Sequence, residues 1–468
     1  MVFSSMTFLW IFLPAVIVLG MIFRKPSVQN IILLMASLIF YAWGEPVYII
    51  LLLVSILMNW VLGMYMGKSS SQGARKAILA LSVICNLSLL GYFKYAGLFT
   101  HTVERFLPSL GVKTVNISLP VGISFFTFQA MSYCIDLYRG EYEYQKDPLK
   151  LALYISFFPQ LIAGPIVRYV DIEKALNDRK VTANGFASGM RRFIYGLSKK
   201  VLIANIVADV VDRVVVNPAS SMGFVTSWFI AICYTLQIYY DFSGYSDMAI
   251  GLGRIFGFEF CENFDLPYLS SSISEFWRRW HISLGTWFRE YLYIPLGGNK
   301  KGNVRTYINL FVVFAATGLW HGASWRFAFW GIYHGFFAVI ERLGFSKFLK
   351  KHKIFAHIYT ILVFTFGWVV FRADGLRYGL SWIKQMVIPS AGSLRLGVFA
   401  GPWHISALVL GLIGCGPLHV FCGYIRDKKK GPKFTGSICE TVILGLLLIA
   451  CIIRLSGNTY NPFIYFRF

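Results

Sequence analysis

The sequence predicts an all-α polytopic membrane protein. Of its 468 residues, 56% are hydrophobic and 14% are charged, and the mean hydropathy is +0.60. A soluble domain would carry about 25% charged residues. Many apolar runs reach the roughly 20 residues that a helix needs to cross a bilayer. We therefore expect one membrane domain over residues 1–468, with about 11–13 transmembrane or re-entrant helices.

The distribution of charge and cysteine supports this class and excludes others. The net charge is +22, but the basic residues fall mostly in loops between apolar runs, as in cytoplasmic loops of membrane proteins. The expected partner is therefore the lipid bilayer, including its anionic lipids, and not a nucleic acid. The eight cysteines lie mostly in apolar runs without metal-binding spacing, so we interpret them as packing residues and predict no metal site.

Basic loops set the orientation of the first four spans, which we expect at residues 6–23, 31–43, 47–66 and 78–99. The first span lacks a basic leader and runs directly into Arg24-Lys25, so we interpret it as a retained helix with its N-terminus outside. The turn at residues 44–46 carries no Lys or Arg, whereas the turn at residues 68–76 is basic. Arg24 and residues 68–76 are therefore expected in the cytoplasm.

The next segments are too polar or too broken for simple spans. Residues 121–138 mix polar and aromatic side chains, so we expect them buried in the bundle or re-entrant. Residues 149–166 contain Pro159, Gly164 and Pro165, which predict a broken helix lining a protein cavity. Residues 185–211 are amphipathic and basic, as in a helix lying partly at the cytoplasmic interface.

The second half continues with apolar helices. A span at residues 224–240 leads into Asp241-Phe242-Ser243-Gly244-Tyr245-Ser246-Asp247 and then residues 248–258. Apolar residues recur at helical spacing from Trp277 to Phe288, which predicts one two-faced helix over residues 274–293. Further helices are expected at residues 306–320, 327–340, 355–371, 404–421 and 441–453. The basic run at 426–433 should be cytoplasmic, which places a tail at 458–468 outside.

Two histidines are the strongest candidates for chemistry. His321 lies in Gly318-Leu319-Trp320-His321-Gly322, near the middle of a long apolar region. An ionisable residue at membrane depth suggests a functional site, and its flanking glycines suggest close helix packing or a helix break. His281 falls on the apolar face of the predicted helix at 274–293. A buried imidazole is suited to proton transfer near neutral pH, although a buried histidine can also be a packing residue, which is our interpretation of His334.

Other residues have two open interpretations, and several standard motifs are absent. The embedded Asp241 and Asp247 could orient a histidine or contact substrate, or they could form salt bridges with Arg254, Arg278 or Arg279. The sequence contains no GxSxG, HExxH or P-loop motif, and its glycines miss the dinucleotide-binding spacing.

Four stretches of this sequence resemble the membrane-bound O-acyltransferase superfamily, in its alginate O-acetylation branch. They are residues 158–166 (FPQLIAGPI), 240–247 (YDFSGYSD), 276–298 (FWRRWHISL through YIPLGG) and 317–322 (TGLWHG). The order and spacing match over essentially the whole chain. One departure is Gly285, where a serine is more usual.

The resemblance implies an acyltransferase with tilted helices around a central tunnel. His321 would be the catalytic histidine and His281 its partner, which positions the donor or polarises its carbonyl. Arg278 and Arg279 would hold anionic parts of the donor, and Trp320 would contact substrate. The implied donor is cytoplasmic acetyl-CoA, with no bound cofactor. The acceptor would be an exported polysaccharide. The protein itself would lie in the inner membrane, and an extracytoplasmic, SGNH-hydrolase-like acetyltransferase would pass the acetyl group to the polysaccharide.

The tail suggests a carrier for the acetyl group. Tyr465 lies in an aromatic run that has two open interpretations. The run could be an interfacial anchor, or it could act as an acyl carrier, because it resembles the C-terminus of the partner peptide in teichoic acid D-alanylation. A phenol ester is a good acyl donor because its leaving group has a pKa of about 10. We therefore hypothesise that Tyr465 takes the acetyl group and His321 activates its hydroxyl. Alternative functions are D-alanyl transfer to teichoic acid and proton-coupled transport, although no inverted repeat is visible.

Overall fold

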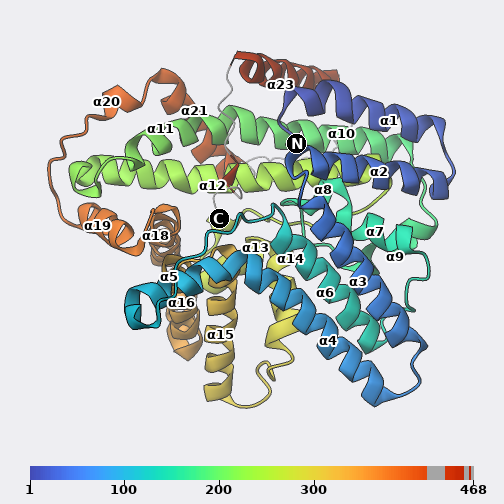
Figure 1. Cartoon of the computed structure of the whole chain (residues 1–468). Coiled ribbons are helices and arrows are strands. Elements are labelled where there is room, and N and C mark those ends of the chain that lie inside the picture. The colour runs from blue at the N-terminus through green and yellow to red at the C-terminus, as the bar shows by residue number, and fades with distance from the viewer. Residues whose placement is uncertain (419–437, 458–462, 465–468) are drawn as a thin grey trace. The chain divides into compact units, whose positions relative to one another are not determined.

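The computed structural model describes residues 1–418, 438–457 and 463–464, and these residues form helices joined by loops (Figure 1). Among them, the one strand-like pairing is a single bridge between Phe264 and Trp280. Five of the described helices are long and apolar enough to cross a membrane: Pro26–Gly44, Ile49–Lys68, Gln72–Phe106, Lys353–Arg372 and Ile438–Gly457. The prediction of an all-α polytopic membrane protein is therefore confirmed.

The chain forms two compact units. Unit 1 contains Met1–Phe193 and Ser246–Cys261, and unit 2 contains Ile194–Tyr245 and Glu262–Phe468. Helices α10 (Ala183–Ser198) and α12 (Gly223–Ile255) contribute residues to both units. The assignment of residues 1–468 to one membrane domain stays a prediction.

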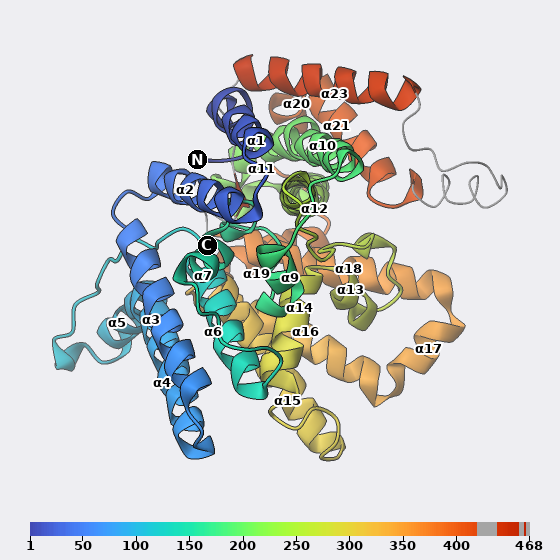
Figure 2. The same ribbon diagram turned by 90° about the vertical axis from the view of Figure 1, so that its right-hand side faces the viewer.

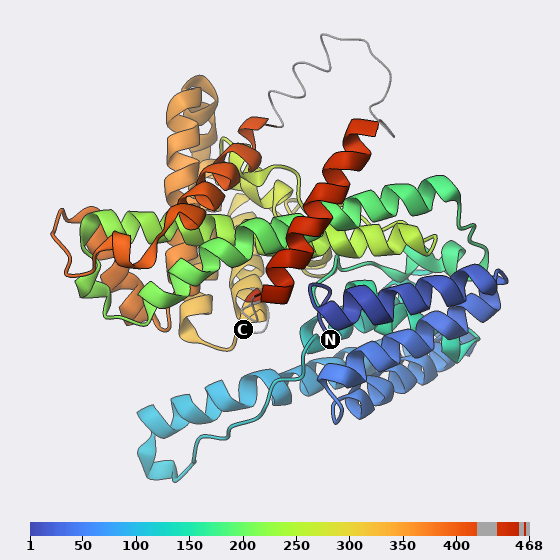
Figure 3. The same cartoon turned by 90° about the horizontal axis from the view of Figure 1, so that it is seen from above.

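Unit 1 is built on the apolar N-terminal helices. Helices α3, α4 and α6 lie side by side (Figures 1 and 2), and α1 lies beside α2 (Figure 3). The helices are η1 (Phe8–Phe12), α1 (Leu13–Ile22), α2 (Pro26–Gly44), α3 (Ile49–Lys68), α4 (Gln72–Leu90), η2 (Gly91–Tyr95), α5 (Ala96–Phe106), η3 (Pro108–Leu110), α6 (Ile123–Arg139), α7 (Pro148–Ser156), α8 (Phe158–Leu161) and α9 (Tyr169–Asn177).

The burial predicted for residues 121–138 and the helix break predicted within residues 149–166 are confirmed, and the cavity lining predicted for residues 149–166 stays a prediction. Helix α6 is buried along most of its length, including its polar residues Thr127, Gln129 and Asp136. The chain breaks between α7 and α8 at Phe157, which has extended ψ, and Pro159 lies in the first turn of α8. Proline lacks the N–H that a continuous helix would need at this point.

Unit 2 carries the longer second half of the chain. Its elements are η4 (Lys199–Ala204), α11 (Asn205–Val215), η5 (Ala219–Ser221), η6 (Pro267–Leu269), α13 (Ile273–Arg279), α14 (Ile282–Phe288), η7 (Arg289–Tyr293), α15 (Asn303–His321), α16 (Trp325–Ile340), η8 (Glu341–Phe345), α17 (Ser346–Lys351), α18 (Lys353–Arg372), α19 (Leu376–Val387), α20 (Leu396–Phe399), α21 (Pro402–Gly414) and α23 (Ile438–Gly457). Helices α15 and α16 form an antiparallel hairpin, and α18 packs on α16 (Figure 2).

Helix α12 differs from the prediction of a span followed by a separate segment. The sequence from Asp241 to Asp247 lies within one continuous helix. Within unit 2, a Cβ on Gly244 would lie 2.7 Å from the carbonyl oxygen of Gly196. The glycine in this motif therefore permits close approach of two backbones and does not mark a turn.

The predicted basic interface helix at 185–211 is divided among α10, η4 and α11. Its lysine Lys200 is buried, and its Nζ lies 2.5 Å from Oδ1 of Asp241. This lysine therefore belongs to a buried ion pair and not to a lipid-facing surface.

Candidate active site

A pocket of about 410 Å³ in unit 2 contains both candidate histidines. Residues from α13, α14 and α15 line it, and the ring centroids of His281 and His321 are 6.5 Å apart. The fold therefore places both candidate imidazoles at one pocket. Both side chains are buried, with exposed fractions of 2% for His281 and 7% for His321.

The predicted continuous helix over residues 274–293 is wrong. Helix α13 ends at Arg279, Trp280 is extended, and His281 takes the left-handed conformation with φ of 47° and ψ of 54° before α14 begins. Trp280 instead pairs with Phe264 through the isolated bridge. Helical periodicity could not reveal this break, because a pairing with a segment distant in sequence produces it. Backbone strain of this kind is common at functional sites.

The hydrogen bonds around Asn263 define the tautomer of His281. Oδ1 of Asn263 accepts from the backbone N–H of Ser283 at 3.2 Å, from Oγ of Ser283 at 2.9 Å, and faces Nδ1 of His281 at 3.1 Å. A backbone N–H can only donate, so the atom at this position is the amide oxygen. Nδ1 of His281 must then carry the proton and donate. In the neutral ring, the lone pair is on Nε2.

The second ring nitrogen of His281, Nε2, has a different environment. This atom is buried and has no hydrogen-bond partner among the described residues. Burial lowers the pKa of His281 well below its ordinary value, and the nearby His321 lowers it further, so the ring is neutral at physiological pH. A neutral ring with its lone pair on Nε2 accepts a hydrogen bond, which suits it to hold an N–H or O–H group and not to polarise a carbonyl.

Close packing of α15 against α16 places His321. It is the last residue of α15 and precedes the extended Gly322. A Cβ on Gly318 would lie 2.2 Å from the carbonyl oxygen of Phe327, and one on Gly331 would lie 2.2 Å from that of Phe314. Only glycine permits this approach, so the flanking glycines provide both the close packing and the helix end that the sequence suggested.

Aromatic rings surround His321 on several sides. Its ring centroid lies 5.0 Å from that of Trp320, 5.3 Å from that of Trp330 and 5.3 Å from that of Phe371. Trp320 also lies 6.0 Å from His281. These rings pack around the imidazole and limit the positions that it can take.

The two predicted arginines have different roles. Arg278 is exposed and lines the pocket, together with Arg289 from the following segment. Arg279 instead forms a salt bridge with Glu275, with a nitrogen–oxygen distance of 2.9 Å. The buried carboxylate of Glu341 accepts from the backbone N–H groups of Ile273 and Ser274, and so holds the N-terminus of α13.

The two predicted aspartates form ion pairs. Asp241 binds Lys200, and its Oδ2 accepts from the backbone N–H of Ile464 at 2.8 Å. In unit 1, Asp247 binds Arg192 at 2.8 Å. The two ion-pair partners, Lys200 and Arg192, are not the arginines that the sequence suggested. Asp241 thus holds the backbone of Ile464, and neither aspartate is among the residues that line the histidine pocket.

His334 and the tail complete the predicted set. His334 is fully buried with its ring 4.9 Å from those of Trp277 and Trp330, in agreement with its interpretation as a packing residue. Tyr465 lies outside the described residues. Its neighbours Phe463 and Ile464 are described, and Phe463 stacks on Tyr245 with a centroid distance of 4.7 Å.

Sequence reasoning missed Asn263, Ser283, Arg289 and Glu341. Asn263 is a buried polar residue between Glu262 and Phe264, and its distance of 18 residues from His281 matches no helical or motif spacing. An amide side chain next to the aromatic residue Phe264 was the one signal in the sequence that could have drawn attention to it.

Comparisons with known proteins give a consistent result. Residues 141–381 match the model of MBOAT, the membrane-bound O-acyltransferase family. The chain is 39% identical to the protein named "Probable alginate O-acetylase AlgI" of Pseudomonas putida, with both chains fully covered. It is 36% identical to the peptidoglycan O-acetyltransferase of Helicobacter pylori, over 83% of this chain and 80% of that one. It is 28% identical to the teichoic acid D-alanyltransferase of Bacillus subtilis, over 55% of this chain and 69% of that one.

Proposed function

Because this chain belongs to the membrane-bound O-acyltransferase family, we propose that it moves an acetyl group from cytoplasmic acetyl-CoA across the inner membrane for O-acetylation of an exported polysaccharide. It is an O-acyltransferase and a multi-pass membrane protein. The donor, the direction of transfer and the final acceptor are the proposed parts. The observation that carries the proposal is the pair of buried imidazoles, 6.5 Å apart in one pocket.

The pocket chemistry suits acyl transfer from a thioester to a hydroxyl. The hydroxyl oxygen attacks the carbonyl carbon, and His321 takes the hydroxyl proton as general base. The bond from the carbonyl carbon to sulfur then breaks, and the leaving thiolate takes this proton from the imidazolium of His321, which returns to its neutral form. Arg278 and Arg289, exposed at the pocket, suit the phosphates of the donor. Nε2 of His281 is available to accept from an amide N–H of its pantetheine arm.

The tail is the proposed route out of the pocket. Ile464 donates to Asp241, and Nζ of Lys200 lies 5.3 Å from the ring centroid of Phe463. These contacts hold the residues just before Tyr465 inside unit 2. They support the proposal that the hydroxyl of Tyr465 is the attacking group and that an extracytoplasmic acetyltransferase later removes the acetyl group from the phenol ester.

Acetyl transfer is favoured over the alternatives. The relatives that cover most or all of this chain are named O-acetylases or O-acetyltransferases, whereas the D-alanyltransferase covers about half of it. A transporter would not be expected in this enzyme family.

Thiol release from purified full-length protein separates these functions. Acetyl-CoA and a D-alanyl-charged carrier protein are supplied separately, and free thiol is measured over time. The proposal predicts release from acetyl-CoA alone. Thiol release from the D-alanyl carrier alone would contradict acetyl-CoA as the donor. Thiol release from neither compound would contradict both transfer reactions.

A further inference from the structure

A second cavity, in unit 1, is lined by cations and aliphatic side chains. Its volume is about 730 Å³, and residues of α1, α2, the start of α10 and the end of α12 line it. The lining contains three cationic side chains, Arg24, Arg179 and Lys180, and no carboxylate. None of the three forms a salt bridge with a described residue.

Arg179 is the residue that suggests a ligand. Its exposed fraction is 6%, and its Nη1 donates to Oδ1 of Asn30 and to the carbonyl oxygen of Ala175. Its Nε and Nη2 are buried with no hydrogen-bond partner among the described residues. Burial lowers its pKa to about 10, so the group remains charged. A buried guanidinium with two unused donors matches a bidentate oxyanion.

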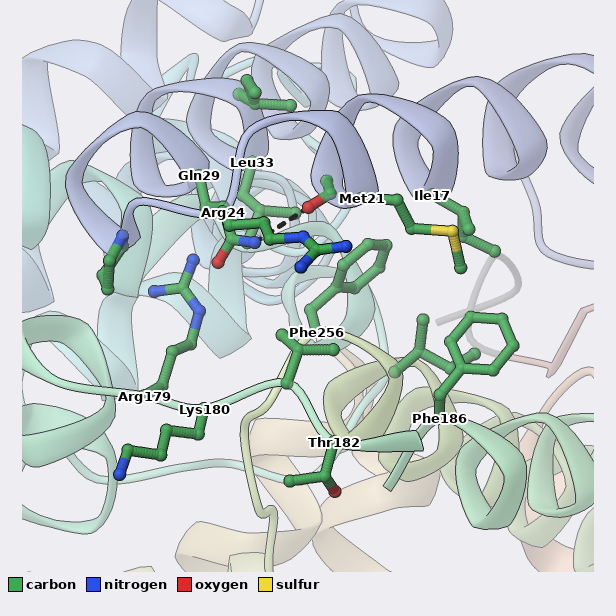
Figure 4. Close-up of a pocket in the computed structure, with 15 residues that line it drawn as sticks. Ile17, Met21, Arg24, Gln29, Leu33, Arg179, Lys180, Thr182, Phe186 and Phe256 are labelled. Carbon is green, nitrogen blue, oxygen red and sulfur yellow. Dashed lines mark hydrogen bonds between the residues drawn. The ribbon is translucent and has the colours of Figure 1, made fainter. Parts of the chain in front are cut away.

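Other groups in the cavity also favour a negatively charged ligand. Figure 4 shows the guanidinium of Arg24 and the amide of Gln29 in the cavity with Arg179. Gln29 is fixed there by donating to the carbonyl oxygen of Gly20 at 2.9 Å. Helix α10 begins beside Thr182, so the positive end of its dipole also favours an anion.

The apolar part of the lining indicates the rest of the ligand. Ile17 and Met21 come from α1, and Ile32 and Leu33 come from α2. Helix α2 is one of the candidate membrane spans, and α1 is a shorter apolar helix. The cations therefore lie where two apolar helices meet at the Arg24 turn, which the loop charges assign to the cytoplasmic face.

We propose that this cavity binds an anionic phospholipid, with its phosphate at Arg179 and Arg24 and an acyl chain along the aliphatic side chains of α1 and α2. Basic pockets between membrane helices on the cytoplasmic side commonly bind anionic headgroups. The phosphates of coenzyme A present similar oxyanions but no acyl chain of comparable length. The aliphatic lining therefore favours the lipid.

Native mass spectrometry of the delipidated full-length protein tests this site. Phosphatidylglycerol and phosphatidylcholine are added separately, at equal concentrations, and the retained lipid adducts are counted. We expect phosphatidylglycerol to be retained in preference to phosphatidylcholine. Arg179→Gln and Arg24→Gln should each weaken this retention by about tenfold, the loss expected for one charge-assisted hydrogen bond.

Lys25→Gln is the matched control, because Lys25 is exposed in the same turn as Arg24 but does not line the cavity. It removes the same charge and should leave retention unchanged. Arg24 is itself exposed, so Arg24→Gln tests the site even if Arg179→Gln does not fold. Equal retention of the two lipids, or equal effects of Arg24→Gln and Lys25→Gln, would overturn the proposal.

Addition of coenzyme A and of inorganic phosphate identifies the source of the oxyanion. We expect neither to displace phosphatidylglycerol at millimolar concentration. If coenzyme A displaces the lipid and its binding is weakened by Arg24→Gln, the cavity is a nucleotide site and the lipid proposal fails. Because the cavity is distinct from the histidine pocket, this result does not depend on the proposed reaction.

Discussion

Asn263 controls which nitrogen of His281 carries the proton. Its amide oxygen, identified by the backbone N–H of Ser283, accepts from Nδ1 of His281. The lone pair of Nε2 is therefore available to the substrate, and burial keeps the ring neutral. The tautomer of His281 is thus set by a residue that does not itself line the pocket.

Asn263→Asp should change the pH dependence of catalysis. A carboxylate next to Nδ1 stabilises the imidazolium, so the pKa of His281 rises. If catalysis requires the neutral ring, acidification protonates the ring of the variant, and the variant loses activity, at a higher pH than the wild type. The acidic limb of kcat/KM against pH should move towards neutrality, whereas the wild type should be flat there. An unchanged profile in a folded variant would show that His281 does not act as a neutral acceptor.

Tyr465→Phe should stop polysaccharide acetylation in cells without lowering the protein level. The substitution keeps the ring, and hence any anchoring role, but removes the hydroxyl that would carry the acetyl group. Tyr460→Phe, in the same tail, is the control and should acetylate normally. Normal acetylation by Tyr465→Phe would mean that the acetyl group passes directly from its donor to the next acceptor.

At the scale of elements, the hairpin of α15 and α16 positions His321. Gly331→Ala would place a methyl group 2.2 Å from the carbonyl oxygen of Phe314, so the helices must separate. Overpacking of this kind costs about 1–3 kcal/mol, and the shift should also displace His321 and reduce acyl transfer. Gly445→Ala in α23 meets nothing within 4 Å and should be tolerated. Thermal stability in detergent and thiol release measure the two effects, and equal behaviour of the variants would contradict this role of the hairpin.

The sequence was informative where local rules decide the structure. Long apolar runs predicted the spans, and proline predicted the break before α8. The Gly-X-X-His-Gly pattern indicated the tight end of α15. Pairings between distant segments were not predictable, which is why the break at His281 was missed: it depends on Phe264 and Asn263. For the same reason, the amphipathic pattern of residues 185–211 indicated a helix at the membrane interface and did not reveal that Lys200 is buried against Asp241.

For the whole molecule, the loop charges predict the orientation in the membrane. Tags inserted at residue 72 or residue 430 should be cytoplasmic, and a tag at the C-terminus should be extracytoplasmic. Protease or thiol-reagent accessibility in spheroplasts reads out each position. A cytoplasmic C-terminus would contradict the loop-charge argument and would also prevent Tyr465 from delivering an acetyl group outside.

The most direct measurement compares thiol release from radiolabelled acetyl-CoA by the full-length wild type, His321→Ala and the exposed control His101→Ala. Loss of a general base slows a reaction by about 10²–10⁴-fold. Size-exclusion elution verifies that each variant is folded. We predict wild-type release by His101→Ala and at least about 100-fold slower release by folded His321→Ala. Release at the wild-type rate by His321→Ala would contradict the assignment of this histidine pocket as the active site.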